Sequence, residues 1–164
     1  MTIMELGALG EFVGAIAVVM TLIYLTLQLR QNTNAVEANT ARVVTEELQD
    51  MFALLASNQE LAEILVKAAG GSELQGAQRV RYYTYTHNLL RVYENAFLQF
   101  QSGVFDQAHW AGMTRMMIDF TSAAGFQSYW LNRKHWVSDD FQEYMDTNVI
   151  SVLPKTGVDL PGDY

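Results

Sequence analysis

The sequence contains no cysteine and only 2 prolines among its 164 residues. Without cysteine the chain has no disulfide framework, no thiol nucleophile and no zinc or iron–sulfur site built on thiolates. Because prolines are so few, long periodic stretches run without a break, which favours helices over a turn-rich β-sandwich. Basic residues are also scarce, since 10 lysines and arginines stand against 18 acidic residues and the formal net charge is −8. This balance argues against a nucleic-acid-binding protein, which needs a basic surface.

Hydrophobic residues, by contrast, make up 50% of the chain, and an apolar run lies near its N-terminus. Residues 12–29 are 18 residues without a charged side chain, and extending the run back to Leu6 adds only Glu11. A helix over residues 6–29 would be about 36 Å long, which is enough for a tilted bilayer crossing. The run therefore predicts a single transmembrane anchor over residues 1–30, although a fully buried core helix of a soluble bundle has the same composition.

Charge asymmetry around this run predicts its orientation. No lysine or arginine precedes Arg30, and Arg42 follows shortly afterwards, so the positive-inside rule places the rest of the chain in the cytoplasm. The lack of a basic N-terminal region also disfavours a cleaved signal peptide. Within the run, Gly10 and Gly14 have the Gly-x-x-x-Gly spacing that lets two membrane helices pack closely, although glycine is common in such helices in any case.

After residue 30, amphipathic stretches alternate with short breakers. The first stretch has apolar residues at 3–4–3–4 spacing, which predicts a helix with one packing face; they are Ala41, Val44, Leu48, Met51 and Leu55. Further stretches follow, so residues 31–153 are predicted to form an all-α bundle of about five helices. Residues 154–164 contain both prolines and are predicted to be a flexible tail.

Capping residues predict the helix boundaries. Asn58, Asp106 and Ser138 are predicted N-caps, because their side-chain oxygens can accept a hydrogen bond from a first-turn N–H. Ser72–Gln75 matches a capping box and predicts the start of the longest helix, which Gly103 is predicted to end. Apolar residues on two faces predict a central position for this helix. The two sets are Val80, Tyr83, His87, Leu90 and Phe97, and Tyr82, Leu89, Tyr93, Ala96 and Phe100.

The same helix contains a charged pair on a face that is expected to be buried. Arg91 and Glu94 are three residues apart, on the side of His87. One interpretation is a ligand pocket in the bundle core, in which Arg91 holds an anionic or carbonyl group and Glu94 holds a donor. The other is an internal ion pair that fixes the helix register, because structural ion pairs imitate functional ones.

A second candidate site has an unusual local composition. Trp130, Arg133, Lys134 and Trp136 combine the only adjacent basic pair of the chain with two tryptophans. This group could rest on a membrane surface, with the rings at the interface and the cations on anionic lipid. Alternatively, both tryptophans pack in the core and both cations face water.

Motifs of enzymes and metal centres are absent from the sequence. The 3 histidines include no Glu-x-x-His pair of the kind that di-metal bundles use. The chain contains no Gly-x-Ser-x-Gly elbow, phosphate-binding loop or dinucleotide fingerprint. We therefore predict no catalytic residue, no metal and no cofactor.

Several landmarks occur together in order. They are residues 22–33 (LIYLTLQLRQNT), residues 91–103 (RVYENAFLQFQSG), Asp106, Trp110, Trp130, Trp136 and residues 138–141 (SDDF). Together they resemble a widespread group of small bacterial proteins that have an N-terminal transmembrane span and a C-terminal helical domain. That group has no established activity, so the resemblance implies an architecture and a bacterial origin, and it assigns no catalytic residue.

These observations predict a membrane-anchored helical binding or scaffold protein at the bacterial inner membrane, with its C-terminal domain in the cytoplasm. Its expected partners are membrane lipid and either another protein or a second copy of the chain, and no nucleic acid. The alternative is a ligand-responsive sensor module with a polar pocket around Arg91, Glu94 and His87.

Overall fold

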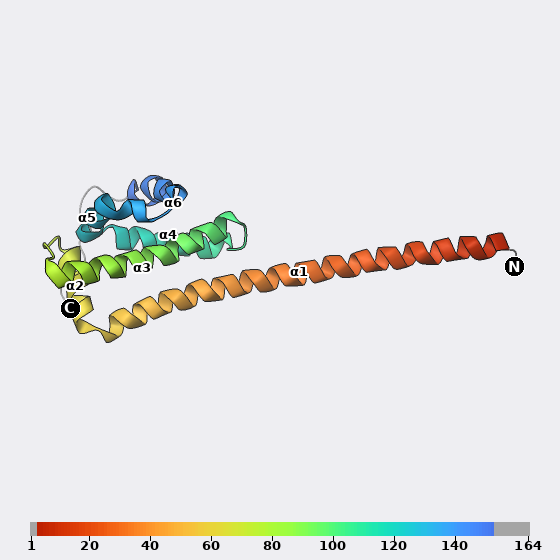
Figure 1. The fold of residues 1–164 in the computed structure, drawn as a ribbon, viewed down its shortest axis with the longest axis horizontal. Helices are drawn as coiled ribbons and strands as arrows, with labels where there is room; N and C mark the ends of the chain where they lie inside the picture. The colour runs from red at the N-terminus through yellow and green to blue at the C-terminus, as the bar shows by residue number, and fades with distance from the viewer. Residues whose placement is uncertain (1–2, 153–164) are drawn as a thin grey trace. The chain divides into compact units, whose positions relative to one another are not determined.

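A computed structural model describes residues 3–152, and within this range every regular element is helical (Figure 1). The elements are α1 (Ile3–Ser57), α2 (Gln59–Ala69), α3 (Gly76–Gln101), α4 (Gln107–Thr121), α5 (Ala124–Arg133), a 3-10 turn η1 (Lys134–Trp136), α6 (Asp139–Tyr144) and a π-helical segment η2 (Met145–Ile150). The predicted all-α fold is therefore confirmed. The predicted tail over residues 154–164 lies outside the described residues.

The chain divides into two compact units, residues 1–39 and residues 40–164. Helix α1 does not break at residue 30, where the sequence predicted the end of the anchor, but continues to Ser57. Its final turns, after residue 40, therefore belong to the bundle unit.

Within the first unit, the apolar part of α1 is long enough to cross a membrane. Its best 18-residue window has a mean hydropathy of 2.1, and none of that window is buried. The polar side chains in this region find partners inside the helix. Thr21 and Thr26 each donate to the carbonyl oxygen four residues earlier at 2.8 Å, and Gln28 donates to the Tyr24 hydroxyl at 2.6 Å. By length and composition, this helix could span a bilayer.

The second unit has a single hydrophobic core. The predicted packing face of residues 41–55 is confirmed, because Val44 and Leu48 are buried and the other three apolar residues are partly buried against the core. Helix α3 contributes ten buried residues and packs against α2 and α4 (Figure 1). Val80 was predicted to be on an apolar face of α3, but it is 65% exposed.

The capping predictions were correct at two helix starts. The Asn58 side chain accepts from the Leu61 N–H at 3.0 Å, and Asp106 accepts from the N–H groups of Ala108 at 2.7 Å and His109 at 3.1 Å. The backbone N–H and ring of His109 therefore lower the pKa of the Asp106 carboxyl. Gly103 ends α3 with a φ of 74°, a left-handed conformation that glycine adopts without strain.

One capping prediction was wrong, and another was correct in position but not in its hydrogen bond. Ser72 does not start α3, because its N–H donates to the Lys67 carbonyl at 3.0 Å and so belongs to the C-terminal turn of α2. Residues 72–75 have no regular structure, and α3 begins only at Gly76. Ser138 occupies the N-cap position of α6, but its side chain makes no capping hydrogen bond.

Helices α2 and α5 approach very closely at Gly125. A Cβ atom at this position would lie 2.8 Å from both the Cβ and the carbonyl oxygen of Ala68, and 3.0 Å from the Tyr82 hydroxyl. Only a residue without a side chain fits such a contact. The close approach places α5 opposite the first half of α3, where a cavity opens.

Candidate functional site

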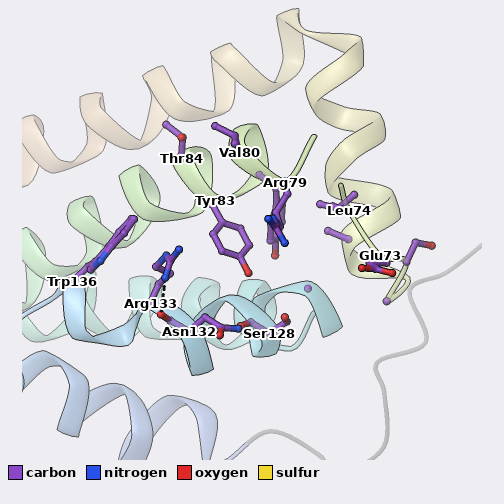
Figure 2. Close-up of a pocket in the computed structure, with 15 residues that line it drawn as sticks. Glu73, Leu74, Arg79, Val80, Tyr83, Thr84, Ser128, Asn132, Arg133 and Trp136 are labelled. Carbon is purple, nitrogen blue, oxygen red and sulfur yellow. Dashed lines mark hydrogen bonds between the residues drawn. The ribbon is translucent and has the colours of Figure 1, made fainter. Parts of the chain in front are cut away.

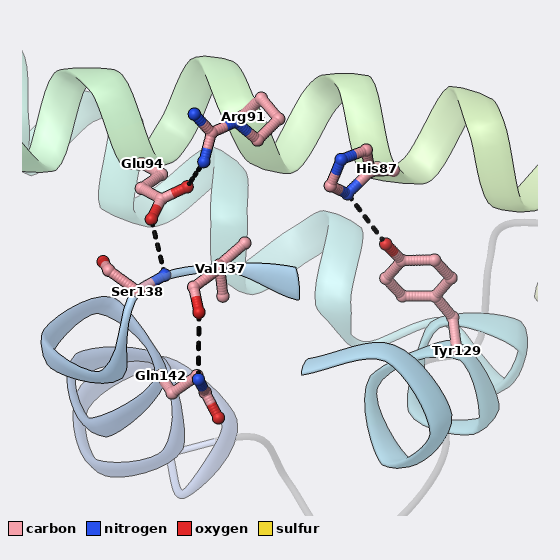
Figure 3. A network of polar contacts seen from close by, with 7 residues as sticks. All are labelled: His87, Arg91, Glu94, Tyr129, Val137, Ser138 and Gln142. Atoms are coloured by element: carbon pink, nitrogen blue, oxygen red, sulfur yellow. Dashed lines mark hydrogen bonds and ion pairs between the residues drawn. The ribbon is translucent and has the colours of Figure 1, made fainter. Parts of the chain in front are cut away.

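Glu94 is only 3% exposed, and both of its carboxylate oxygens have partners (Figure 3). One oxygen accepts the backbone N–H of Ser138 at 2.7 Å, and the other forms an ion pair with Arg91. The first N–H groups of a helix have no partner within the helix. Glu94 therefore supplies, from α3, an acceptor for the backbone N–H of the N-cap residue of α6.

Arg91 pairs with Glu94 but is largely exposed, and His87 faces a different helix. The Arg91 side chain is 58% exposed and lines a shallow groove of about 520 Å³ with acidic residues of α1 such as Glu47 and Asp50. His87 faces α5, where its Nδ1 lies 3.3 Å from the Tyr129 hydroxyl. The bundle has two further cavities, one of about 710 Å³ between α3 and α5 and one of about 300 Å³ lined by residues of α1, α2 and α3. Neither His87 nor Glu94 lines the groove or either of these cavities. The predicted site residues are therefore not gathered around one pocket.

The protonation states of the His87–Tyr129 pair follow from burial. Burial lowers the pKa of His87, and the nearby Arg91 charge lowers it further. Burial raises the pKa of Tyr129 to about 12. The imidazole is therefore neutral near neutral pH, and it shares a hydrogen bond with the neutral phenol. This pair has the character of a structural contact between α3 and α5.

The predicted membrane-surface group is divided by the fold. Trp130 is 4% exposed, stacks on Phe126 with ring centroids 5.9 Å apart, and donates from Nε1 to Asp146 at 2.7 Å. Lys134 binds the other oxygen of Asp146 at 2.9 Å. Burial alone would raise the pKa of Asp146, but these two hydrogen bonds together lower it. Trp130 is thus a core residue, which corrects the prediction that it lies at the membrane surface.

Arg133 and Trp136 instead line a cavity of about 710 Å³, which we call the α3–α5 cavity (Figure 2). Its walls come from the end of α2, the loop before α3, the first half of α3, α5 and η1. The lining residues are Ala68, Gly71, Ser72, Glu73, Leu74, Arg79, Val80, Tyr82, Tyr83, Thr84, Gly125, Ser128, Asn132, Arg133 and Trp136. It is the largest of the three cavities described here.

The Arg133 guanidinium is held by aromatic rings and by no carboxylate. Its carbon lies 4.9 Å from the centre of the Trp136 ring and 5.8 Å from that of Tyr83. Its Nε atom is buried without a hydrogen-bond partner, and its Nη1 donates only to the carbonyl of Asn132, at 3.2 Å. Within residues 3–152, no ion pair includes Arg133.

Polar groups around the α3–α5 cavity can bind a ligand but form no obvious catalytic set. Arg79 extends beside Tyr83 in Figure 2, and it too has no ion pair in the described part of the chain. Burial raises the pKa of Tyr82 to about 12, so its phenol stays neutral. Among the described residues, those that line the cavity include one carboxylate, Glu73, and no histidine. Among the described residues, no group of three histidine or carboxylate side chains could hold a metal ion.

Sequence reasoning did not identify Arg79 and Tyr83 as site residues. A signal existed, because Arg79 and Tyr83 are four residues apart and Arg133 and Trp136 are three apart, which is the spacing of neighbours on a helix. That signal shows two local pairs and does not show that the pairs face the same cavity. No family model, no curated protein and no solved structure matches this chain. Its function is therefore inferred from its own residues.

Proposed function

We propose that the protein is a membrane-anchored helical binding protein that acts as an accessory or interaction subunit at the inner membrane of a bacterium. The observation that carries the proposal is the apolar run of α1, no part of which is buried. Exposing that run to water is unfavourable by about 25 cal/mol for each Å² of apolar surface. A bilayer would solvate it, and the side-chain hydrogen bonds within the run suit a medium without water.

The orientation and the partner are further parts of this proposal. Arg30 and Arg42 follow the run and no basic residue precedes it, which supports a cytoplasmic bundle. The Gly-x-x-x-Gly spacing of Gly10 and Gly14 supports association with a second copy, and no described residue covers α1 at either position. Two such helices could therefore approach closely along this face.

Fractionation tests the anchor. The full-length protein is expected in the membrane fraction, resistant to alkaline carbonate and released by detergent. Val19→Arg with Leu22→Arg places two charges in the run. Each charge near the bilayer centre makes insertion less favourable by about 2.5–3.5 kcal/mol, so the double variant should not insert stably. Ala35→Arg with Val36→Arg adds the same charge beyond the run and should leave the protein in the membrane. Wild-type protein in the soluble fraction without detergent would refute the anchor.

Orientation can be tested with one engineered thiol, because the chain has no cysteine of its own. Lys67→Cys places a thiol on the exposed side of α2. A membrane-impermeant thiol reagent should label it only after the cells are opened. Labelling of intact cells would overturn the cytoplasmic orientation.

Cross-linking in native membranes tests the second copy as partner. The wild-type chain should give a dimer, and Gly10→Leu with Gly14→Leu should reduce it, because the bulky side chains prevent close approach. Val19→Leu, which leaves the glycines in place, should not reduce the amount of cross-linked dimer. An unchanged dimer in the glycine variant would remove the glycine pair from the interface.

The alternative function, a sensor module around Arg91, Glu94 and His87, has less support. It needs a cavity at these residues, and the acceptor oxygens of Glu94 are already occupied by Arg91 and Ser138.

A further inference from the structure

The α3–α5 cavity concentrates positive charge in an acidic protein. The chain has a formal net charge of −8, whereas the charged residues that line this cavity are Arg79, Arg133 and Glu73. Figure 2 shows Arg79 and Arg133 on either side of Tyr83, while Glu73 lies at the end opposite Trp136. We propose that the α3–α5 cavity binds a small soluble organic anion, with the acidic group of the ligand on Arg133 and Arg79. This inference concerns the bundle and does not depend on the membrane anchor.

Arg133 has the surroundings of a ligand-binding residue, because its guanidinium is held in place but is not neutralised. Its guanidinium is flanked by the rings of Tyr83 and Trp136, which fix its plane without neutralising its charge. A buried donor without a partner, such as its Nε, is destabilising, so the fold keeps this side chain in place at some cost. An anion on the free edge of the guanidinium would supply the counter-charge that the described residues do not provide.

Arg79 and the neutral donors complete a site for an acidic group. Arg79 comes from α3 and Arg133 from α5, so an anion between them would be held from two helices. The cavity lining also offers the hydroxyl of Ser128 and the amide of Asn132, both on α5. Because arginine presents a planar fork of donors, two arginines favour a carboxylate or a phosphate monoester over a simple halide.

The remaining walls indicate that the ligand also has an apolar part. Ala68, Leu74, Val80 and the Trp136 ring line the same space as the two arginines. The volume of about 710 Å³ is larger than a bare inorganic anion needs and lies within the range of small-molecule pockets. The inferred ligand class is therefore an organic acid with a compact apolar or aromatic body.

Binding can be measured with the full-length protein in detergent, because Trp136 lies in the cavity wall and its fluorescence reports occupancy. The probes are benzoate, phenyl phosphate and benzamide, the last having nearly the shape of benzoate without its charge. Benzoate or phenyl phosphate should bind saturably, and benzamide about tenfold more weakly or worse, because it cannot form the charged hydrogen bonds. Equal binding of benzamide and both anions would overturn the proposal.

Variants assign the binding to the two arginines. Arg79→Gln and Arg133→Gln should each weaken anion binding about tenfold or more. Arg115→Gln, an exposed arginine of α4 outside the cavity, is the matched control and should bind as the wild type does. Within residues 3–152, the Arg79 side chain makes no ion pair with another residue, so its variant remains informative even if Arg133→Gln fails to fold. Wild-type affinity in Arg79→Gln and in folded Arg133→Gln would refute the site.

A lipid source of the anion is distinguished in the same assay. Phosphatidylglycerol or phosphatidylcholine is added to the detergent solution in place of the soluble probes. A response to phosphatidylglycerol alone, with none to benzoate or phenyl phosphate, would overturn the proposal of a soluble ligand. If none of the anions binds, the proposal of a soluble ligand is overturned as well, whereas the proposal of a membrane anchor is unaffected.

Discussion

Truncation of Glu94 tests whether this buried carboxylate is a structural connection between α3 and the start of α6. Glu94→Ala removes the acceptor of the Ser138 N–H, which the structure places at 2.7 Å. It also removes the partner of Arg91, a side chain that is largely in water. The two lost contacts therefore differ greatly in their contribution to the free energy of unfolding.

The expected magnitude follows from burial. A hydrogen bond to a buried charged group contributes about 1.5–3 kcal/mol, and an ion pair with an exposed arginine about 0–1 kcal/mol. We expect Glu94→Ala to lower the free energy of unfolding by about 2–3 kcal/mol. Arg91→Ala should lower it by about 1 kcal/mol or less, because the Arg91 side chain is 58% exposed and water screens its charge.

Thermal unfolding of the full-length protein in detergent, followed by near-ultraviolet circular dichroism, measures both values. For a bundle of this size, 1 kcal/mol corresponds to roughly 3–5 °C in Tm, so Glu94→Ala should lower Tm by roughly 6–15 °C. Glu143→Ala, which removes an exposed carboxylate from α6, is the matched control and should change Tm little. A loss in Arg91→Ala as large as that in Glu94→Ala would refute this reasoning.

Two further predictions use the same measurement. Gly125→Ala should destabilise the bundle by about 1–3 kcal/mol, because its methyl group would overlap Ala68, whereas Gly112→Ala, with no neighbour closer than 3.9 Å, should be neutral or slightly stabilising. Acidification should also destabilise the fold. Because the pKa of His87 is lowered in the folded state, the unfolded chain takes up the proton first, and stability falls as pH drops through 6.5. His87→Asn should lose this dependence of stability on pH, and His135→Asn should keep it. Equal pH profiles for the two variants would refute the assignment of this dependence to His87.

Much of the secondary structure could be predicted from the sequence, because its causes are local. The apolar run, the packing face of residues 41–55, the caps at Asn58 and Asp106 and the stop at Gly103 each depend on residues within one or two turns. The capping box at Ser72 failed because the preceding helix uses that N–H to complete its own C-terminal turn. Two local signals competed there, and the sequence does not show which of them prevails.

The candidate site could not be predicted, because it depends on packing between distant segments. Glu94 and Ser138 are 44 residues apart in the chain, and spacing within α3 cannot show that a backbone N–H of another element reaches the carboxylate. Likewise, the sequence groups Trp130 with Trp136, but the fold buries one in the core and leaves the other 46% exposed beside Arg133.

The sequence by itself determined the helical class and the apolar segment, since both follow from short-range periodicity and composition. The tertiary structure alone decided which charges are neutralised and which line a cavity. The physical reason is that the close contact of α2 and α5 at Gly125 sets α5 opposite α3, and only that arrangement brings Arg133 to the cavity that Arg79 lines.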